Sequence, residues 1–149
     1  MSLNEGNINK TLVIGIGNPL RSDDGIGPYV ADCIEAQGLS GIKVWITQQL
    51  NVEDLERMLE YKRVILVDAS LAGQPLDFRP VEKSTEGDLS SSHHLSAGTF
   101  VNLAGSIYKK NLNMHLCSIR GNNFEVGDKM SPEVLQRAQE AVKLICNSL

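Results

Sequence analysis

The segment RVILVD, residues 63–68, most strongly limits what this chain can fold into. Its four central residues, 64–67, are all large and apolar, so a strand formed by them presents apolar side chains on both faces. Such a strand is stable only when both faces are covered, which is typical of a central strand in a parallel sheet. The segment therefore predicts a sheet with helices packed on each side.

Other strand-like runs occur at regular distances along the chain. A continuous apolar run predicts a strand at 11–16, and we expect further strands at 42–47 and 112–119. Residues 75–81 alternate in polarity and contain two prolines, which predicts an edge strand. The polar stretch 83–92 predicts a mobile loop.

Helical spacing of apolar residues fills the intervals between these strands. It predicts helices at 25–36, from Asn51 to about Tyr61 with Val52, Leu55, Met58 and Leu59 inward, at 93–109, and from Ser131-Pro132 to about Asn147. The order β-α-β-α-β-β-α-β-α predicts a three-layer α/β fold, a twisted, mostly parallel five-stranded sheet with helices on both faces.

Length and charge restrict the domain organisation and the class of partner. We expect residues 1–10 to be a disordered leader and 11–149 to form a single α/β domain. The net charge of −4 gives no basic surface for nucleic acid, and no apolar run is long enough to span a membrane. The N-terminus has no apolar signal core, and the three cysteines form no Cys-x-x-Cys pair, so we expect a cytoplasmic protein.

The glycine-rich segment GIGNPLRSDDGIG, residues 15–27, follows the first predicted strand. It differs from a dinucleotide fingerprint because Leu20 stands where the third glycine is needed, and it lacks the Gly-Lys-Ser/Thr of a Walker loop. Asp23 and Asp24 would also repel a phosphate. We expect one aspartate to cap the following helix and the other to project into a cleft and hold a cation.

Two further polar positions are predicted at the same edge of the sheet. Asp68 ends the 63–68 strand, where it could equally form a capped turn or an ion pair. The segment 91–94, SSHH, precedes an apolar helix. Because imidazole is a common metal ligand, Asp24, Asp68 and one histidine would form an O,O,N site with open positions, suited to nickel or zinc.

These motifs together resemble the [NiFe]-hydrogenase maturation endopeptidases. The family pattern Gly-x-Gly-Asn-x-Leu-x-x-Asp-(Asp/Glu)-x-x-Gly is present at residues 15–27. The resemblance continues at Val67-Asp68-Ala69, at Ser92-His93-His94-Leu95 and over residues 124–134, and it spans nearly the whole chain after residue 10.

The resemblance implies a twisted α/β sheet and specific site residues. It implies that Asp24, Asp68 and His93 contact the metal, with His94 as the rival third ligand. Asp24 is the expected catalytic residue together with Asp23, whose alternative role is to shape the loop. We also expect substrate contacts from Asn18, Gln49 and His94.

The activity implied is removal of the C-terminal extension from a [NiFe]-hydrogenase large-subunit precursor after nickel insertion. Nickel would arrive with this precursor, and the protein would act as a monomer. Segment 47–55 is similar to that of the branch serving cytosolic, cofactor-reducing hydrogenases, with Val52 in place of a proline.

Two mechanisms remain open for this nickel-dependent aspartic-type or metallo endopeptidase. Nickel could polarise the scissile carbonyl or lower the pKa of an attacking water, or it could serve recognition only while Asp24 or Asp23 acts as general base. The alternative functions are a non-catalytic nickel-sensing maturation chaperone and a nucleotide-binding α/β enzyme.

Overall fold

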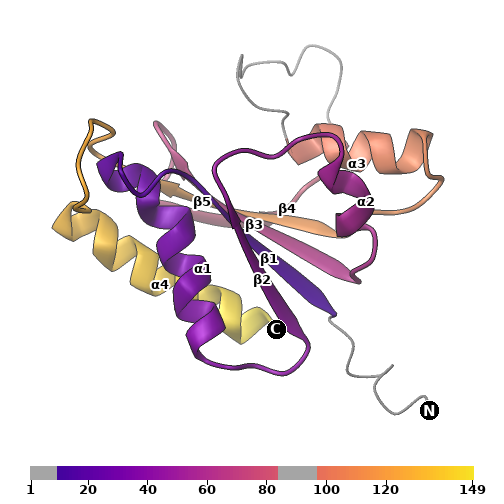
Figure 1. The fold of residues 1–149 in the computed structure, drawn as a ribbon, viewed down its shortest axis with the longest axis horizontal. Coiled ribbons are helices and arrows are strands. Elements are labelled where there is room, and N and C mark those ends of the chain that lie inside the picture. The colour runs from indigo at the N-terminus through magenta and orange to yellow at the C-terminus, as the bar shows by residue number, and fades with distance from the viewer. Residues whose placement is uncertain (1–9, 84–96) are drawn as a thin grey trace.

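A computed structural model of the chain describes residues 10–83 and 97–149 (Figure 1). The elements follow one another as β1 (Thr11–Ile16), the 3₁₀ turn η2 (Ser22–Gly25), α1 (Ile26–Ala36), β2 (Ile42–Thr47), α2 (Asp54–Met58), β3 (Arg63–Ser70), β4 (Leu76–Pro80), α3 (Ala97–Ser106), β5 (Met114–Arg120) and α4 (Pro132–Ser148). Apart from η2, this is the predicted order of strands and helices.

The five strands form one sheet in the order β2-β1-β3-β5-β4. Neighbouring strands are parallel except for β4, which pairs antiparallel with β5 at the edge of the sheet. Parallel pairing brings Thr47 of β2 and Asp68 of β3 to either side of Ile16 of β1. The predicted mostly parallel sheet with a proline-containing edge strand is therefore confirmed.

Helices cover both faces of the sheet, which gives three layers (Figure 1). Helices α1 and α4 pack on one face, where Ile65 and Val67 of β3 belong to their core. Helices α2 and α3 pack on the other face, where Val64 and Leu66 of β3 join a second core. All four side chains are at most 2% exposed, which confirms that RVILVD is a central strand.

Helix α2 is shorter than the sequence predicts. It begins at Asp54 and ends at Met58, and the carboxylate of Asp54 accepts a hydrogen bond from the backbone N–H of Asn51. The predicted inward position of Val52 is wrong, since that side chain lies before the helix and is 49% exposed. Leu55 and Met58 are buried as predicted.

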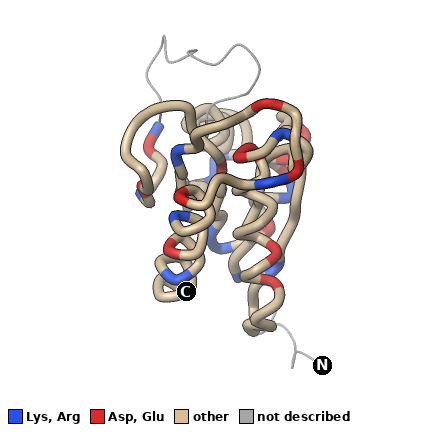
Figure 2. Tube along the Cα trace, turned by 90° about the vertical axis from the view of Figure 1, so that its left-hand side faces the viewer, with Lys and Arg blue, Asp and Glu red and all other residues tan. Residues whose placement is uncertain are grey.

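Some predictions fall on residues outside the described ranges. They are the leader up to residue 9, most of the 83–92 loop and the start of the predicted 93–109 helix. Lys10 is described and belongs to the fold, because its backbone N–H donates to Gly41 O. Within the described ranges no helix is long and apolar enough to cross a membrane. Acidic and basic residues are interspersed along this part of the chain (Figure 2).

Glycines allow the first strand and the first helix to approach at backbone contact distance. A Cβ atom on Gly27 would lie 2.3 Å from Ile16 O and 2.6 Å from Val67 O. Gly17 has φ of +149°, and a Cβ there would meet Asp24 O. Side chains at these positions would push α1 away from the ends of β1 and β3. These two glycines therefore determine where the loop between β1 and α1 lies.

Substituting Gly27→Ala tests this close approach. We expect the free energy of unfolding to fall by at least about 3 kcal/mol, because the atoms that the new methyl group meets are backbone and cannot move aside. Gly105→Ala in α3 is the matched control, since a Cβ there has only Lys83 side-chain atoms nearby, at 3.8 Å or more. That variant should match wild type or gain up to about 1 kcal/mol in urea unfolding. Equal effects of the two substitutions would contradict the packing explanation.

Candidate functional site

The chain reverses its direction of winding at the carboxyl end of β1. Strand β1 lies between β2 and β3, and the helices that follow β1 and β2 lie on opposite faces of the sheet. In open α/β sheets, ligands bind in the crevice at such a switch point, outside the carboxyl ends of the strands. The crevice between β1 and β3 is therefore the expected place for a site.

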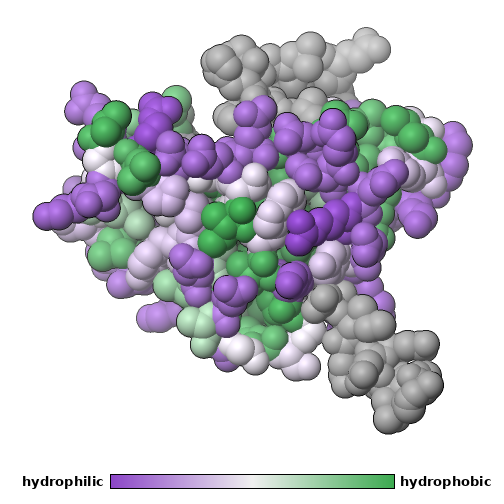
Figure 3. Space-filling model, in the orientation of Figure 1, coloured by the Kyte–Doolittle hydropathy of each residue, from purple (hydrophilic) through white to green (hydrophobic). Residues whose placement is uncertain are grey.

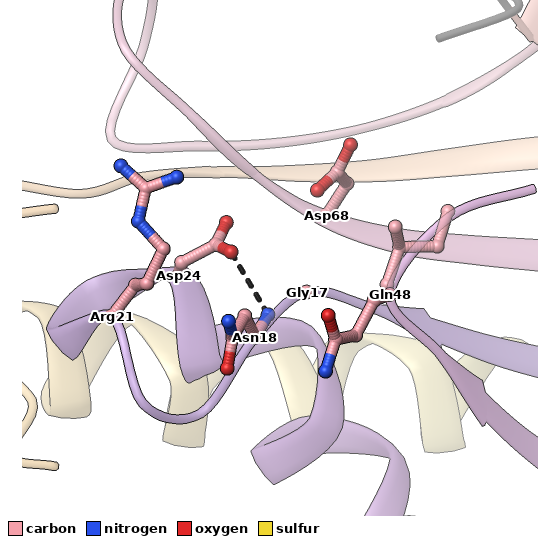
Figure 4. A pocket seen from close by; sticks show the side chains of 7 residues that line it. Gly17, Asn18, Arg21, Asp24, Gln48 and Asp68 are labelled. Carbon is pink, nitrogen blue, oxygen red and sulfur yellow. Dashed lines mark hydrogen bonds between the residues drawn. The ribbon is translucent and has the colours of Figure 1, made fainter. Parts of the chain in front are cut away.

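A cavity of about 220 Å³ lies at this point (Figure 4). Its walls come from the ends of β1 and β3, the loop after β1 and the first residue after β2. The lining residues are Ile16, Gly17, Asn18, Arg21, Asp24, Gln48 and Asp68.

Asp24 is held in the cavity wall by the loop after β1. Its Oδ2 accepts a hydrogen bond from the backbone N–H of Asn18 at 2.8 Å. Gly25 occupies the N-cap position of α1, and no side chain caps that helix. The expectation that one of the two aspartates caps α1 is therefore wrong. Asp24 instead closes its own loop and keeps its second carboxylate oxygen toward the cavity (Figure 4).

Asp68 reaches the same cavity from β3, and Figure 4 shows the two carboxylates on the same side of the glycine-rich loop. Burial raises the pKa of Asp68 to about 7, with a further contribution from the negative charge of Asp24 and a partial compensation by the backbone N–H of Ala69. Neither carboxylate has a Lys or Arg ion-pair partner among the described residues. A bound cation would relieve both the burial and the repulsion.

Asp23 has different surroundings from its neighbour. It is fully buried, and its carboxylate accepts hydrogen bonds from the backbone N–H groups of Asn122, Asn123 and Ser131 at 2.7–2.8 Å and from the Ser131 hydroxyl at 2.9 Å. Burial alone would raise the pKa of Asp23, but these four donors together hold it below its ordinary value. Asp23 does not line the cavity. Its contacts fit the loop-shaping role.

The hydrogen bonds of Asp23 join two loops that are far apart in the sequence. Ser22 adds to this connection, since its N–H donates to Gly127 O and its hydroxyl donates to Glu125 O. Arg21 donates through Nε to Phe124 O at 3.2 Å. The loop of residues 17–25 is thereby fixed against the loop of residues 121–131, and this fixes the backbone that carries Asp24.

The other predicted site residues divide into three groups. Asn18 lines the cavity as expected. Gln49 does not line it, and the preceding residue, Gln48, occupies the wall instead. His93 and His94 lie outside the described residues, so their roles stay predictions. Within 10–83 and 97–149, no three His, Cys, Asp or Glu side chains form a metal-binding group.

Two lining residues were missed by the sequence reasoning. Gln48 is the first residue after β2, and its position at the carboxyl end of a parallel strand was a usable signal. Arg21 offered no such signal, because its place in the wall depends on the contact between its guanidinium and the distant loop at Phe124.

Fold and cavity together define an α/β protein with a carboxylate-lined cleft at the switch point of its sheet. Three solved structures share this fold: the hydrogenase maturating endopeptidase HybD from E. coli (17% identity, TM-score 0.75, 94% of this chain and 91% of that one), the [NiFe] hydrogenase maturation protease HycI from Thermococcus kodakarensis (19%, 0.73, 99% and 97%), and the hydrogenase 2 maturation peptidase from a Thaumarchaeota archaeon (27%, 0.67, 93% and 97%).

These structures confirm the predicted resemblance at the level of the fold. The chain has the fold of the hydrogenase maturation endopeptidases over almost its whole length. No protein-family model matches the sequence, and a comparison with curated protein sequences gives no match.

The buried carboxylate of Asp23 should stabilise the fold at neutral pH. We expect Asp23→Asn to lower the free energy of unfolding by roughly 2–4 kcal/mol at pH 7, because the amide replaces an ionised acceptor of four hydrogen bonds. A lowered pKa in the folded state means that this stability is complete above the unfolded value of 3.8 and is lost as the pH falls through the folded value. Urea unfolding between pH 2 and 7 should show the two proteins converging in acid. Asp32→Asn, at an exposed position of α1, should leave stability unchanged.

Asp68→Asn should change the free energy of unfolding in the opposite direction to Asp23→Asn. The raised pKa of Asp68 means that the folded protein binds more protons than the unfolded chain between about pH 4 and pH 7, so wild-type stability falls as the pH rises through this range. We expect the metal-free variant to be more stable than wild type at pH 8 by on the order of 1–4 kcal/mol, and the difference to shrink toward pH 4. Parallel stability curves for the two proteins would contradict a buried, repelled carboxylate.

Proposed function

We propose that this chain is an endopeptidase that removes the C-terminal extension from the large-subunit precursor of a [NiFe] hydrogenase after nickel insertion. The observation that carries the proposal is the convergence of Asp24 and Asp68 on one cavity at the switch point. It gains support from neighbouring structures described as hydrogenase maturation proteases. The sequence resemblance at residues 15–27 adds a motif of the same family.

The donor chemistry of the cavity suits a divalent cation carried by the substrate. Asp24 and Asp68 offer carboxylate oxygens without an ion-pair partner among the described residues, and the pKa of Asp68 is raised by its burial and, to a smaller extent, by the negative charge of Asp24. We assign the third ligand to His93, with His94 as the alternative. Nickel bound there would supply Lewis-acid polarisation of the scissile carbonyl or acidify an attacking water.

The chain's own residues orient the substrate and handle the proton. Asp24 is held by the Asn18 N–H and has an oxygen free to accept a proton from an attacking water. Asn18 and Gln48 present amide side chains that can bind the peptide backbone near the scissile bond. Asp23 positions this loop, because it accepts four hydrogen bonds from residues 122–131 and does not line the cavity.

The type of precursor, the cellular location and the monomeric state that we propose rest on the sequence resemblance and on the proposed peptidase role. Segment 47–55 is similar to that of the branch acting on cytosolic, cofactor-reducing hydrogenases, so we propose such a precursor as substrate. Its maturation takes place in the cytoplasm. We propose that the enzyme acts as a monomer that leaves the large subunit after cleavage, without nucleic acid or membrane partners.

A cleavage assay on the precursor tests the proposal. Wild-type protein should remove the C-terminal tail only from nickel-loaded precursor, and Asp24→Asn should reduce the rate by at least about 100-fold, as expected for loss of a positioned general base or metal ligand. The product is measured by intact mass spectrometry. Asp32→Asn is the matched control, since it removes an exposed carboxylate from the same segment outside the cavity and should cleave at the wild-type rate.

Other outcomes assign other roles. Equal cleavage by Asp24→Asn would keep the peptidase and remove Asp24 from its mechanism. Nickel-dependent binding of the precursor with its tail left intact would favour a nickel-sensing chaperone. Protection against heating by a nucleotide, without dependence on metal, would favour the nucleotide-binding alternative.

A further inference from the structure

Two large apolar side chains are exposed on the interlocked loops beside the cavity. Leu20 is 65% exposed and Val126 is 90% exposed. They belong to the loops of residues 17–25 and 121–131, respectively, and the backbone N–H of Gly127 donates to Leu20 O. Apolar side chains gather over the loop that enters α4, at the upper left of Figure 3. The hydrogen bond between Gly127 and Leu20 brings the two segments together, and we call Leu20 and Val126 the apolar rim.

Hydrogen bonds hold the backbone next to both rim residues. The Leu20 N–H donates to Asn18 Oδ1 at 2.9 Å. On either side of Val126, Glu125 O accepts the Ser22 hydroxyl, and Gly127 O accepts the Ser22 N–H. The exposure of these side chains is therefore set by a rigid loop structure. A surface held in this way loses little conformational entropy when a partner binds it.

Packing within the chain does not explain why these two positions are apolar. Neither side chain belongs to the two cores described for residues 10–83 and 97–149. Scattered exposed apolar residues are ordinary on protein surfaces, but neighbouring ones on a fixed loop pair next to a cavity are typical of interaction sites. The position of the rim therefore points to contact with whatever enters the cavity.

We infer that Leu20 and Val126 dock an apolar surface of the precursor protein whose tail enters the cleft. This inference rests on the proposed function. Leu20 stands between Asn18 and Arg21, both of which line the cavity, so the rim continues the cavity wall outward. Because the rim adjoins the cavity wall, an occupant that also enters the cavity accounts for both features, which favours the substrate over a second copy of this chain. The rim would add affinity for the folded precursor that contacts at the scissile bond alone do not provide.

The double variant Leu20→Ser, Val126→Ser tests the rim on the nickel-loaded precursor. We expect KM for cleavage and Kd for binding to rise by roughly 10-fold or more, because two buried apolar contacts are lost. The ratio kcat/KM should fall because KM rises, while kcat stays unchanged, since the double variant keeps Asp24 and Asp68. Ile107→Ser at the end of α3, a residue with 61% exposure, is the matched control and should behave as wild type. All variants should share the wild-type melting temperature.

Each other result overturns the inference in a distinguishable way. Unchanged KM and Kd in the double variant, or an equal loss in Ile107→Ser, would remove the rim from substrate binding while leaving the peptidase in place. Concentration-dependent self-association that the double variant abolishes in sedimentation would assign the rim to a second copy. Absence of both cleavage and precursor binding by wild type would overturn the proposed function and the rim with it. If wild type binds the precursor without cleaving it, an unchanged Kd in the double variant would overturn the inference, and a raised Kd would support it.

Discussion

The carboxylate of Asp23 is the interaction on which the rest of the site depends. A single buried anion accepts three backbone N–H groups and one hydroxyl from a loop about 100 residues away in the chain. Burying a charge is unfavourable unless such donors surround it, so the two loops are stable only in each other's presence. The neighbouring Asp24 can therefore face the cavity without needing any stabilising contact beyond the Asn18 N–H.

Asp23 and the cavity residue Asp68 have opposite electrostatic surroundings. Asp23 is surrounded by donors, and its pKa is lowered. Asp68 has only the Ala69 N–H as a compensating donor among the described residues, and its pKa is raised to about 7 by burial and by the charge of Asp24. Asp23 and Asp24 are neighbours in the sequence, but the loop directs the side chain of Asp23 into the protein interior and that of Asp24 toward the strand ends. The fold thus stabilises the charge of Asp23 and disfavours that of Asp68.

The sequence predicts most of the fold because local and long-range signals agree. RVILVD requires cover on both faces, and the intervening segments have helical spacing that supplies it. It places Asp24 and Asp68 at one cleft, since the parallel strands β1 and β3 end at the same edge, although β3 continues two residues past the predicted end at Asp68, to Ser70. It does not predict that Asp23 binds Ser131 or that Gln48 replaces Gln49, because these depend on loop conformation over long sequence distances. The exposed Val52 shows the same limit, since helical spacing alone extends α2 past its true start.

The link between Asp23 and Ser131 spans 108 residues, and this has a consequence during synthesis. Contacts so distant in sequence form late, because the intervening chain must first be made and closed into a loop. While a ribosome is still translating the segment before α4, the donors for Asp23 do not yet exist outside it. The cleft therefore assembles only after the segment that carries Ser131 has emerged, and shorter nascent chains carry the paired aspartates without an organised site.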